Sequence, residues 1–383
     1  MAHKNVSKDL LAKMVKPYYY IKSFCDVKKN FVDRTYFFGG HNMLYFSSDY
    51  MESGHERIFR RFLETRDEHM TAYGSDRYCE SAAEKIRAAC ECPQAEVRFL
   101  TGGTQTNQIA VDLLLAPWQG VAAAETGHVN THEAGAIEWS AHKVITLPGH
   151  GGKADPGELR ELMELWNGDG SREHIVEPGM LYISHPTEYG TLYTRAELEA
   201  LAEVCRAYGL PLYVDGARLG SALAARGTDV TLPVLARCAD AFYIGGTKCG
   251  ALFGEALVFT KNNLPQRFLS RVKQHGALLA KGWSVGLQFD ELFTDGLYFE
   301  LGANAIATAE KLKAGLAAKG YEFYIDSPTN QQFIVADDAL LARLEGEVAY
   351  GFWEKLRDGR TVIRFATSWA TREEDVDALL AFL

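Results

Sequence analysis

Residues 211–248 read PLYVDGARLGSALAARGTDVTLPVLARCADAFYIGGTK, and this stretch decides the fold class. Two short apolar runs, 211–214 and 240–244, are each followed by a polar or glycine-rich turn, and the segment between them has room for a helix. Strand, helix and strand in this order favour a parallel pair of strands. The sequence therefore predicts that Asp215 and Lys248, which follow the two strands, lie at the same edge of a sheet.

The same alternation continues on both sides of this stretch. Apolar runs predict further strands at 97–100, 121–124, 143–147, 180–184 and 255–259, with helices between most of them. Thr194 and Glu197 have the spacing of a capping box, and Gly209 is placed to end the helix that the box opens. This pattern predicts an α/β fold with a largely parallel sheet covered on both faces.

The character of the chain changes after about residue 285. A long helix at 297–318 precedes apolar runs at 321–325, 332–336 and 361–366, which read as strands with helices between and after them. We therefore expect an N-terminal arm (1–45), a large α/β domain (46–284) and a smaller C-terminal α+β domain (285–383).

Composition narrows the class of protein. Among 383 residues, 40 Lys and Arg face 50 Asp and Glu, and the net charge of -10 argues against a nucleic-acid or anionic-membrane partner. No apolar run reaches the roughly 18 residues of a membrane span, and the first residues lack the apolar core of a signal peptide. Seven scattered cysteines favour reduced thiols in a cytoplasmic protein. Cys90 and Cys92 have no second pair at zinc-site spacing, so no metal site is predicted.

Three features stand where predicted strands end: Gly102-Gly103-Thr104-Gln105, Asp215 and Lys248. Taken singly, they read as a tight turn, a helix cap and a solvated lysine. Together they fit one ligand, because a helix N-terminus favours a phosphate, a carboxylate keeps a pyridine nitrogen protonated, and a lysine holds an aldehyde as a Schiff base. A ligand with these three groups is pyridoxal 5'-phosphate (PLP), which acts as an electron sink in amino-acid chemistry.

A set of motifs in fixed order identifies a resemblance. FLTGGTQTNQIAV (99–111), GHVNTHEAGA (127–136), YVDGARLGSA (213–222), YIGGTKCGALFGEALVF (243–259) and VIRFATSW (362–369) resemble the low-specificity L-threonine aldolases of the threonine-aldolase and β-eliminating-lyase group. The resemblance implies PLP as cofactor and the aspartate-aminotransferase-like fold, called fold type I, with a mostly parallel seven-stranded sheet. It also implies a homodimer or homotetramer with active sites at the dimer interface.

The family's roles carry over to matching positions. Lys248 is expected to hold the cofactor, Asp215 to pair with the ring nitrogen, and His128 to stack on the ring near the substrate hydroxyl. Backbone and side-chain groups of Gly103, Thr104 and Gln105 are expected to hold the phosphate. The substrate carboxylate is assigned to Ser48, Arg218 and Arg364, with Arg218 also near the cofactor. Fixing that carboxylate selects which bond at the α-carbon is weakened, and guanidinium groups suit the task.

Two regions depart from the usual family pattern. Residues 271–283 occupy the place from which a neighbouring subunit donates basic residues toward the phosphate, and they offer Arg271, Lys273 and above all Lys281. Where these aldolases usually carry a histidine that positions water or the hydroxyl, this chain has Glu188. A carboxylate can also act as a base, although its reference pKa is about two units lower than that of His.

The activity predicted first is retro-aldol cleavage of a threonine-like β-hydroxy-α-amino acid to glycine and an aldehyde, with an amino acid as the small-molecule partner. β-Elimination with Lys248 as the proton carrier is the alternative, and racemisation a weaker one. A PLP-binding protein without catalysis also remains open. A Rossmann dehydrogenase fits poorly, because no G-x-G-x-x-G follows the first strand.

Overall fold

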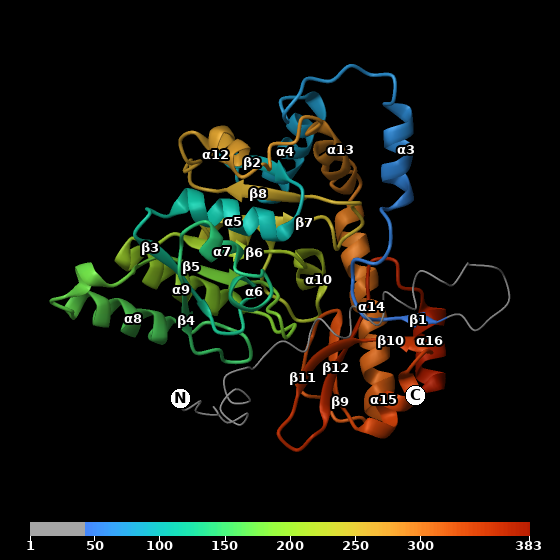
Figure 1. Ribbon diagram of the computed structural model, residues 1–383. Coiled ribbons are helices and arrows are strands. Elements are labelled where there is room, and N and C mark those ends of the chain that lie inside the picture. Colours follow the sequence, from blue (N-terminus) through green and yellow to red (C-terminus); the bar gives the residue numbers. More distant parts are fainter. Residues whose placement is uncertain (1–42) are drawn as a thin grey trace, which may run out of the picture. The chain divides into compact units, whose positions relative to one another are not determined.

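A seven-stranded sheet lies at the centre of the part of the chain that the computed structural model describes, residues 43–383 (Figure 1). In spatial order its strands are β2 (Glu96–Leu100), β8 (Glu255–Phe259), β7 (Ala241–Gly245), β6 (Leu212–Asp215), β5 (Glu177–Ser184), β3 (Gln119–Ala124) and β4 (Val144–Leu147). All neighbours pair in parallel except β8, which is antiparallel to both β2 and β7. The predicted α/β fold with a mostly parallel sheet is confirmed.

Both faces of the sheet are buried, and the side chains of each strand alternate between two cores. Leu212 and Val214 of β6 belong to one hydrophobic cluster, whereas Tyr213 between them belongs to the other. This alternation follows from the two-residue period of a strand. The central strands are therefore apolar throughout, which is why they stand out in the sequence as continuous runs.

Helices cover the two faces. The helices whose side chains join the first core are α3 (Glu56–Glu64), α4 (Arg77–Ala89), α8 (Pro156–Gly168), α9 (Arg195–Tyr208), α10 (Leu219–Ala224), α11 (Leu232–Cys238), α13 (Trp283–Leu292) and the start of α14 (Leu297–Ala318). Those that join the second are α5 (Gly103–Leu114), α6 (His128–Thr131), α7 (Ala136–Trp139) and α12 (Phe268–Gln274). A short 3-10 turn, Arg172–His174, precedes β5. The capping box of Thr194 and Glu197 opens α9, and Gly209 ends it with φ 69°.

The C-terminal part has its own sheet and core. The long helix α14 (Leu297–Ala318) is followed by an antiparallel sheet in the order β11 (Gly351–Lys355), β12 (Thr361–Ala366) and β9 (Gln331–Ala336), with α15 (Asp338–Leu344) and α16 (Glu373–Phe382). A two-stranded parallel pair joins β1 (Leu44–Tyr45) to β10 (Val348–Ala349). A third hydrophobic cluster lies among these elements and includes Phe46.

One predicted strand differs from the observed structure. The run at 321–325 forms only an isolated bridge between Phe323 and Ile334 rather than a strand. Among the helices, α3 ends at Glu64, where the hydroxyl of Thr65 donates to the carbonyl of Arg61 and closes the last turn. The predicted N-terminal arm lies outside the described residues except for its last three, and the boundary near residue 285 stays a prediction.

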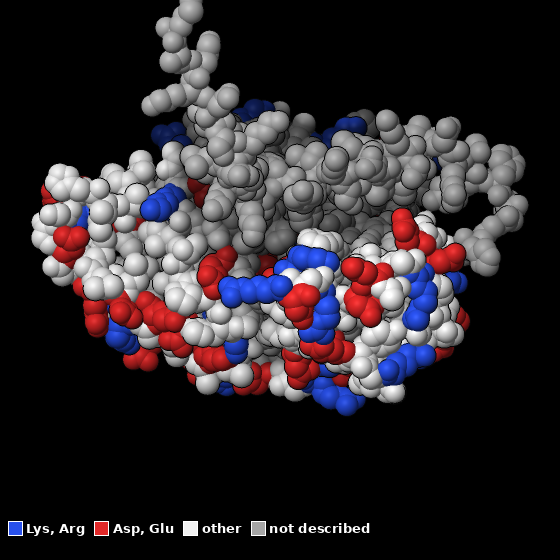
Figure 2. Space-filling model, turned by 60° about the horizontal axis from the view of Figure 1, so that its bottom comes forward, with Lys and Arg blue, Asp and Glu red and all other residues white. Residues whose placement is uncertain are grey.

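The structure also shows how the charged side chains and the cysteines of the described residues are distributed. Figure 2 shows acidic and basic side chains interspersed over the visible part of one face. Six cysteines are free and buried. Within residues 43–383, no helix is both long enough and apolar enough to cross a membrane.

Candidate active site

Asp215 and Lys248 lie at the same edge of the central sheet. Strands β6 and β7 pair in parallel through Tyr213 with Ala241 and Val214 with Phe242, so they end on the same side. Asp215 is the last residue of β6, and Lys248 follows the end of β7 at Gly245 by one short turn. This placement agrees with the prediction from their spacing.

Asp215 is held as a rigid, ionised carboxylate. It is 4% exposed; its Oδ2 accepts from Asn107 Nδ2 at 2.8 Å and from the Tyr182 hydroxyl at 2.7 Å, and its Oδ1 accepts from the Ala217 N–H at 2.9 Å. Burial alone would raise the pKa of this carboxyl. The charge of His128 and the surrounding hydrogen bonds outweigh burial, and the pKa lies below its usual value.

Lys248 is a half-buried amine whose charge is disfavoured. Its Nζ lies 5.7 Å from the ring centroid of Tyr50. Burial and, next, the positive charge of Arg218 lower its pKa to about 8, against the opposing attraction of Asp49, Asp215 and Glu255. About half of this amine is therefore neutral near pH 8, and the neutral form is the one that acts as a nucleophile.

The glycine-rich turn forms the N-terminus of α5. Gly102 is the N-cap residue, and no side chain caps this helix end. The backbone N–H groups of the first turn, at Gly103, Thr104 and Gln105, therefore remain available to an anion. The side chain of Gln105 is engaged locally, because its Oε1 accepts from the Thr101 N–H at 3.2 Å and hydroxyl at 2.8 Å. A Cβ at Gly103 would lie 3.0 Å from the Tyr243 hydroxyl, so the turn approaches the sheet edge closely.

His128 and Glu188 meet at the same edge, from the segments that follow β3 and β5. The backbone N–H of His128 donates to Glu188 Oε1 at 2.9 Å, and the Ser184 hydroxyl donates to the same oxygen at 2.6 Å. The other oxygen of Glu188 has no hydrogen-bond partner among the described residues. Burial raises the pKa of Glu188, which brings it closer to that of a useful base near neutral pH.

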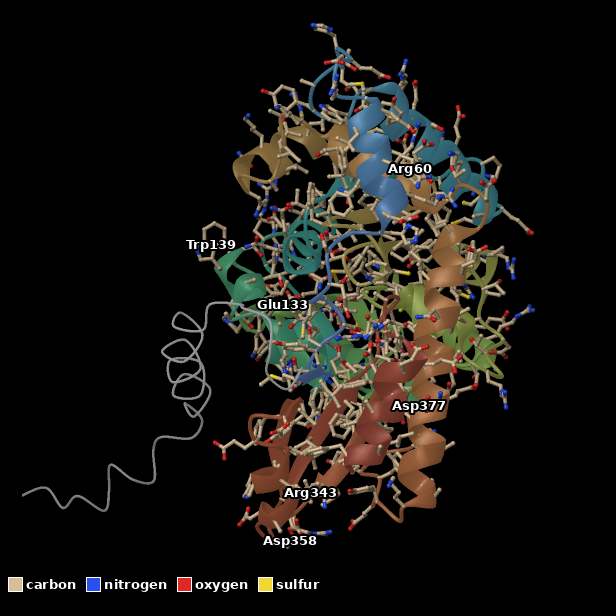
Figure 3. The ribbon with its side chains drawn as sticks, turned by 90° about the vertical axis from the view of Figure 1, so that its right-hand side faces the viewer. Arg60, Glu133, Trp139, Arg343, Asp358 and Asp377 are labelled. Carbon is tan, nitrogen blue, oxygen red and sulfur yellow. The ribbon has the colours of Figure 1, made fainter. Side chains whose placement is uncertain are left out.

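Asn107 and Glu133 complete the site, and neither was predicted. His128 Nδ1 lies 2.9 Å from Glu133 Oε1, and Asn107 Nδ2 donates to that oxygen at 2.7 Å as well as to Asp215. Glu133, labelled in Figure 3, is 5% exposed. Asn107 lies in the motif TGGTQTN and Glu133 in the motif GHVNTHEAGA. Their closeness in sequence to predicted site residues is the feature that could have identified them.

His128, Glu133 and Asp215 also form the one group of potential metal ligands among the described residues, with ligand atoms within 4.8 Å of one another. The amide of Asn107 points its N–H bonds at both carboxylates. A cation between these carboxylates would face those donors unfavourably. Among the described residues these side chains therefore form one hydrogen-bond network.

Arg218 makes a direct ion pair with Asp49. Its Nε and Nη2 donate to the two carboxylate oxygens of Asp49 at 2.6 and 3.0 Å. Asp49 also accepts from Asn330 Nδ2 at 2.9 Å and is 1% exposed. Burial would raise the pKa of Asp49, but Arg218 and Lys248 hold it far below its usual value. Arg218 is thus already neutralised by a residue that sequence reasoning did not select.

Arg364 and Ser48 are linked to that pair through the segment 47–50. Arg364, on β12, donates to Gln331 Oε1 at 2.8 Å and to the carbonyl of Ser47 at 2.9 Å. The Ser48 hydroxyl accepts from the N–H of Tyr50 at 3.4 Å. The segment 47–50 therefore connects Arg364, Arg218 and Lys248, and it brings the three predicted carboxylate-binding residues into one neighbourhood.

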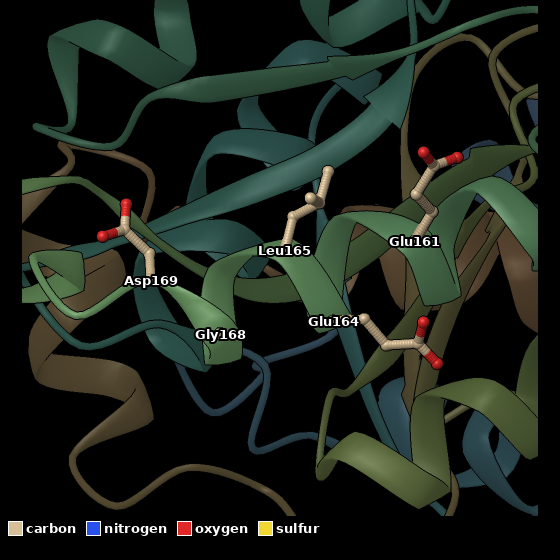
Figure 4. A pocket seen from close by; sticks show the side chains of 5 residues that line it. All are labelled: Glu161, Glu164, Leu165, Gly168 and Asp169. Atoms are coloured by element: carbon tan, nitrogen blue, oxygen red, sulfur yellow. The ribbon is translucent and has the colours of Figure 1, made fainter.

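The basic stretch 271–283 has other partners within the chain. Arg271 is ion-paired with Asp112, and Lys273 Nζ lies 5.2 Å from the ring centroid of Tyr73. Lys281 is exposed just before α13. A surface hollow of about 580 Å³ near the end of α8 is lined by Glu161, Glu164, Leu165, Gly168 and Asp169 (Figure 4), and none of the predicted site residues lines it.

Comparison with known proteins decides the family. The model of the beta-eliminating lyase family matches residues 46–338. The chain belongs to this family. The low-specificity L-threonine aldolase of Pseudomonas sp. (strain NCIMB 10558) is 32% identical over 316 residues, which is 82% of this chain and 89% of that protein. The corresponding aldolase of Pseudomonas aeruginosa is 29% identical, with 87% and 95% covered.

Solved structures agree with the fold of this beta-eliminating lyase family member. A threonine aldolase of Leishmania major has a TM-score of 0.85 and 41% identity, covering 88% of this chain and 97% of that one. An aspartate aminotransferase of Thermus thermophilus has a TM-score of 0.68 at 17% identity, with 99% of each chain covered. The second likeness shows the fold alone, and it confirms the predicted aspartate-aminotransferase-like architecture.

Proposed function

We propose that the protein is a PLP-dependent aldehyde-lyase that cleaves a threonine-like β-hydroxy-α-amino acid to glycine and an aldehyde. The observation that carries this proposal is the pairing of an ionised carboxylate, Asp215, with a depressed-pKa lysine, Lys248, at one sheet edge. The names of the two Pseudomonas relatives and of the Leishmania structure support threonine aldolase chemistry.

The residues at the sheet edge suit PLP. The uncapped N-terminus of α5 offers N–H groups for the phosphate, Asp215 offers a charge for the ring nitrogen, and Lys248 offers an amine for the aldehyde. When bound, the cofactor accepts electron density from the α-carbon of the substrate. Lys281 and the other basic residues of 271–283 would contact the phosphate only in the site of a neighbouring subunit.

His128 and Glu188 are assigned to the proton of the substrate hydroxyl. An ionised Glu133 accepts from Nδ1–H of His128, which leaves Nε2 as the free, basic nitrogen. Glu188 holds the backbone of His128, and its second oxygen is free to accept from a hydroxyl or a water. Removal of that hydroxyl proton drives cleavage of the bond between the α- and β-carbons.

The substrate carboxylate is assigned to Arg364, with Ser48 and Arg218 beside it. Arg218 is bound to Asp49, so its first role is to orient that acid and to add positive potential. Arg364 lies near the same segment and carries a guanidinium suited to a carboxylate.

The test is product analysis with a panel of β-hydroxy-α-amino acids. Stoichiometric glycine and aldehyde supports the proposal, and loss of both with Lys248→Ala ties the products to this site. β-Elimination is the second candidate, favoured by a Lys248 pKa of about 8, which suits a base at the α-carbon. Pyruvate and ammonia from serine, without glycine from any hydroxy amino acid, would establish that candidate instead.

We also propose a homodimer or homotetramer in the cytoplasm. The six free, buried cysteines suit a reducing compartment. Size-exclusion chromatography with light scattering tests the assembly, and a monomer with full activity would contradict it.

A further inference from the structure

Glu255 is a buried carboxylate at the edge of the sheet where the candidate site lies. It is the first residue of β8 and is 4% exposed. Because β8 is antiparallel to both neighbours, its first residue pairs with Gly245 at the end of β7 and with Leu100 at the end of β2. Glu255 therefore lies between the turn that carries Lys248 and the turn that opens α5.

Its two oxygens clamp the turn that precedes Lys248. Oε2 accepts from the Gly246 N–H at 3.0 Å, and Oε1 accepts from the Thr247 hydroxyl at 2.8 Å. The same hydroxyl accepts from the Gly254 N–H at 3.1 Å. The backbone from Gly246 to Thr247 is thus fixed directly before the lysine.

The charge of Glu255 acts on that lysine. Both of its hydrogen-bond donors are neutral, and the positive charge that acts on it is Lys248. Burial raises the pKa of Glu255 to about 8, against the Thr247 hydrogen bond and the Lys248 charge. The carboxyl group of Glu255 therefore loses its proton over the same pH range as the Lys248 amine.

We propose that Glu255 is a positioning residue for Lys248, which fixes the turn from which the lysine extends and, as it ionises, favours the protonated form of the lysine nitrogen. The inference rests on the proposed function only in taking Lys248 as the residue that carries the cofactor. It concerns the protonation of that amine and not the bond that is cleaved.

Other titratable groups around the pair stay unchanged in the test. They are Asp215 and Tyr213 on β6, Tyr243 on β7, Tyr298 on α14, and Asp49 with Arg218. Because each remains in place in every variant, a change in the titration of Lys248 reports on residue 255.

The experiment measures acetylation of Lys248 against pH in the cofactor-free, full-length chain, quantified by peptide mass spectrometry. In Glu255→Gln the midpoint is expected to fall by about one pH unit relative to the unsubstituted chain, because loss of the nearby negative charge favours the neutral amine. An unmoved midpoint, or one that rises, overturns the proposal.

Two further variants separate charge from structure. Thr247→Val removes a hydrogen bond of the clamp but keeps the carboxylate, so the midpoint should stay within a few tenths of a pH unit. A fall equal to that of Glu255→Gln overturns the charge role.

Glu255→Asp shortens the side chain by one methylene group and so moves the carboxylate away from its partners. The midpoint should fall by less than it does in Glu255→Gln. If Glu255→Gln does not fold, this variant decides, and an unmoved midpoint again overturns the proposal.

The labelling needs neither cofactor nor substrate. A protein that gives the expected shift but forms no glycine would refute the proposed function and leave the role of Glu255 intact. A protein that forms glycine but shows no shift would support the proposed function and refute the role of Glu255.

Discussion

At the scale of single residues, His128 and Asp215 are joined through two intermediate side chains. Asn107 donates to both Glu133 and Asp215, and Glu133 in turn binds the ring of His128. The proposed base and the proposed partner of the cofactor nitrogen therefore share one buried network. A change at Glu133 should disturb catalysis although this residue is not expected to contact substrate.

Glu133→Gln tests that network. The neutral amide no longer favours the Nδ1–H form of His128, so kcat should fall about a hundredfold with little change in KM. The matched control is Glu158→Gln, because Glu158 binds His150 at 2.7 Å on the surface in a similar pair. Equal kcat values for Glu133→Gln and the unsubstituted enzyme would show that Glu133 does not orient the base.

The pKa of Lys248 predicts how the rate of cofactor binding depends on pH. Its pKa is lowered to about 8 chiefly by burial. Below this pH the amine is protonated and cannot attack an aldehyde, so the rate of capture should rise with pH and level off above about pH 8. Stopped-flow absorbance of the cofactor-free chain measures the rate. A rate that still rises tenfold between pH 9 and 10 would indicate an ordinary lysine and contradict the account.

At the scale of elements, the N-terminus of α5 is positioned by its close approach to β7. A Cβ at Gly103 would lie 3.0 Å from the Tyr243 hydroxyl, and the same hydroxyl helps to lower the pKa of Asp215. The absence of a side chain at Gly103 therefore allows the backbone of the turn to lie close to Tyr243 at the sheet edge.

Gly103→Ala should weaken cofactor binding about tenfold, because either the turn or Tyr243 must shift away from its place. Equilibrium titration of the cofactor-free chain with PLP measures the affinity. Gly168→Ala at the end of α8 is the control, since a Cβ there meets nothing within 4 Å. Unchanged affinity in Gly103→Ala would show that the turn does not need the glycine.

Helix α13 is tied to α3 and α4 by two buried acids. Asp290 Oδ1 accepts from Lys85 Nζ and from the Ser81 hydroxyl, each at 2.6 Å, and Glu291 binds Arg57 at 2.5 Å. These contacts connect helices that are distant in the sequence.

Asp290→Ala should lower the free energy of unfolding by about 2 kcal/mol, because it removes a 6% exposed partner of a charged lysine. The control is Asp377→Ala, since the Asp377 side chain is 60% exposed and solvent screens its pair with Lys311, so the loss should be much smaller. Denaturant unfolding measures both variants. Equal effects would show that burial does not set the strength of these pairs.

At the scale of the whole described chain, the site is assembled from three distant regions. The segment 47–50, the edge of the central sheet and the strand β12 contribute Asp49, Arg218 and Arg364, respectively. Neither the central sheet nor the C-terminal sheet alone contains all of the predicted substrate contacts. The substrate would therefore lie where these regions meet.

The sequence could predict the parts of this arrangement that are local. Buried strands read as apolar runs, and strand ends carry Asp215 and Lys248, so the fold class and the two main residues follow from pattern and order. The antiparallel direction of β8 leaves no such trace, and so the place of Glu255 beside Lys248 could not be read from the sequence. The pair of Arg218 with Asp49 depends on tertiary packing between segments that lie far apart in the chain.

The central claim is that Lys248 carries the cofactor, with Asp215 at its ring nitrogen. The most direct measurement is to load the purified chain with PLP, reduce it with borohydride, digest it and locate the modified lysine by mass spectrometry. We expect a yellow protein with a band on the order of 420 nm and a single modified peptide that contains Lys248. Modification of a different lysine, or a Lys248→Ala chain that keeps the colour, would contradict it.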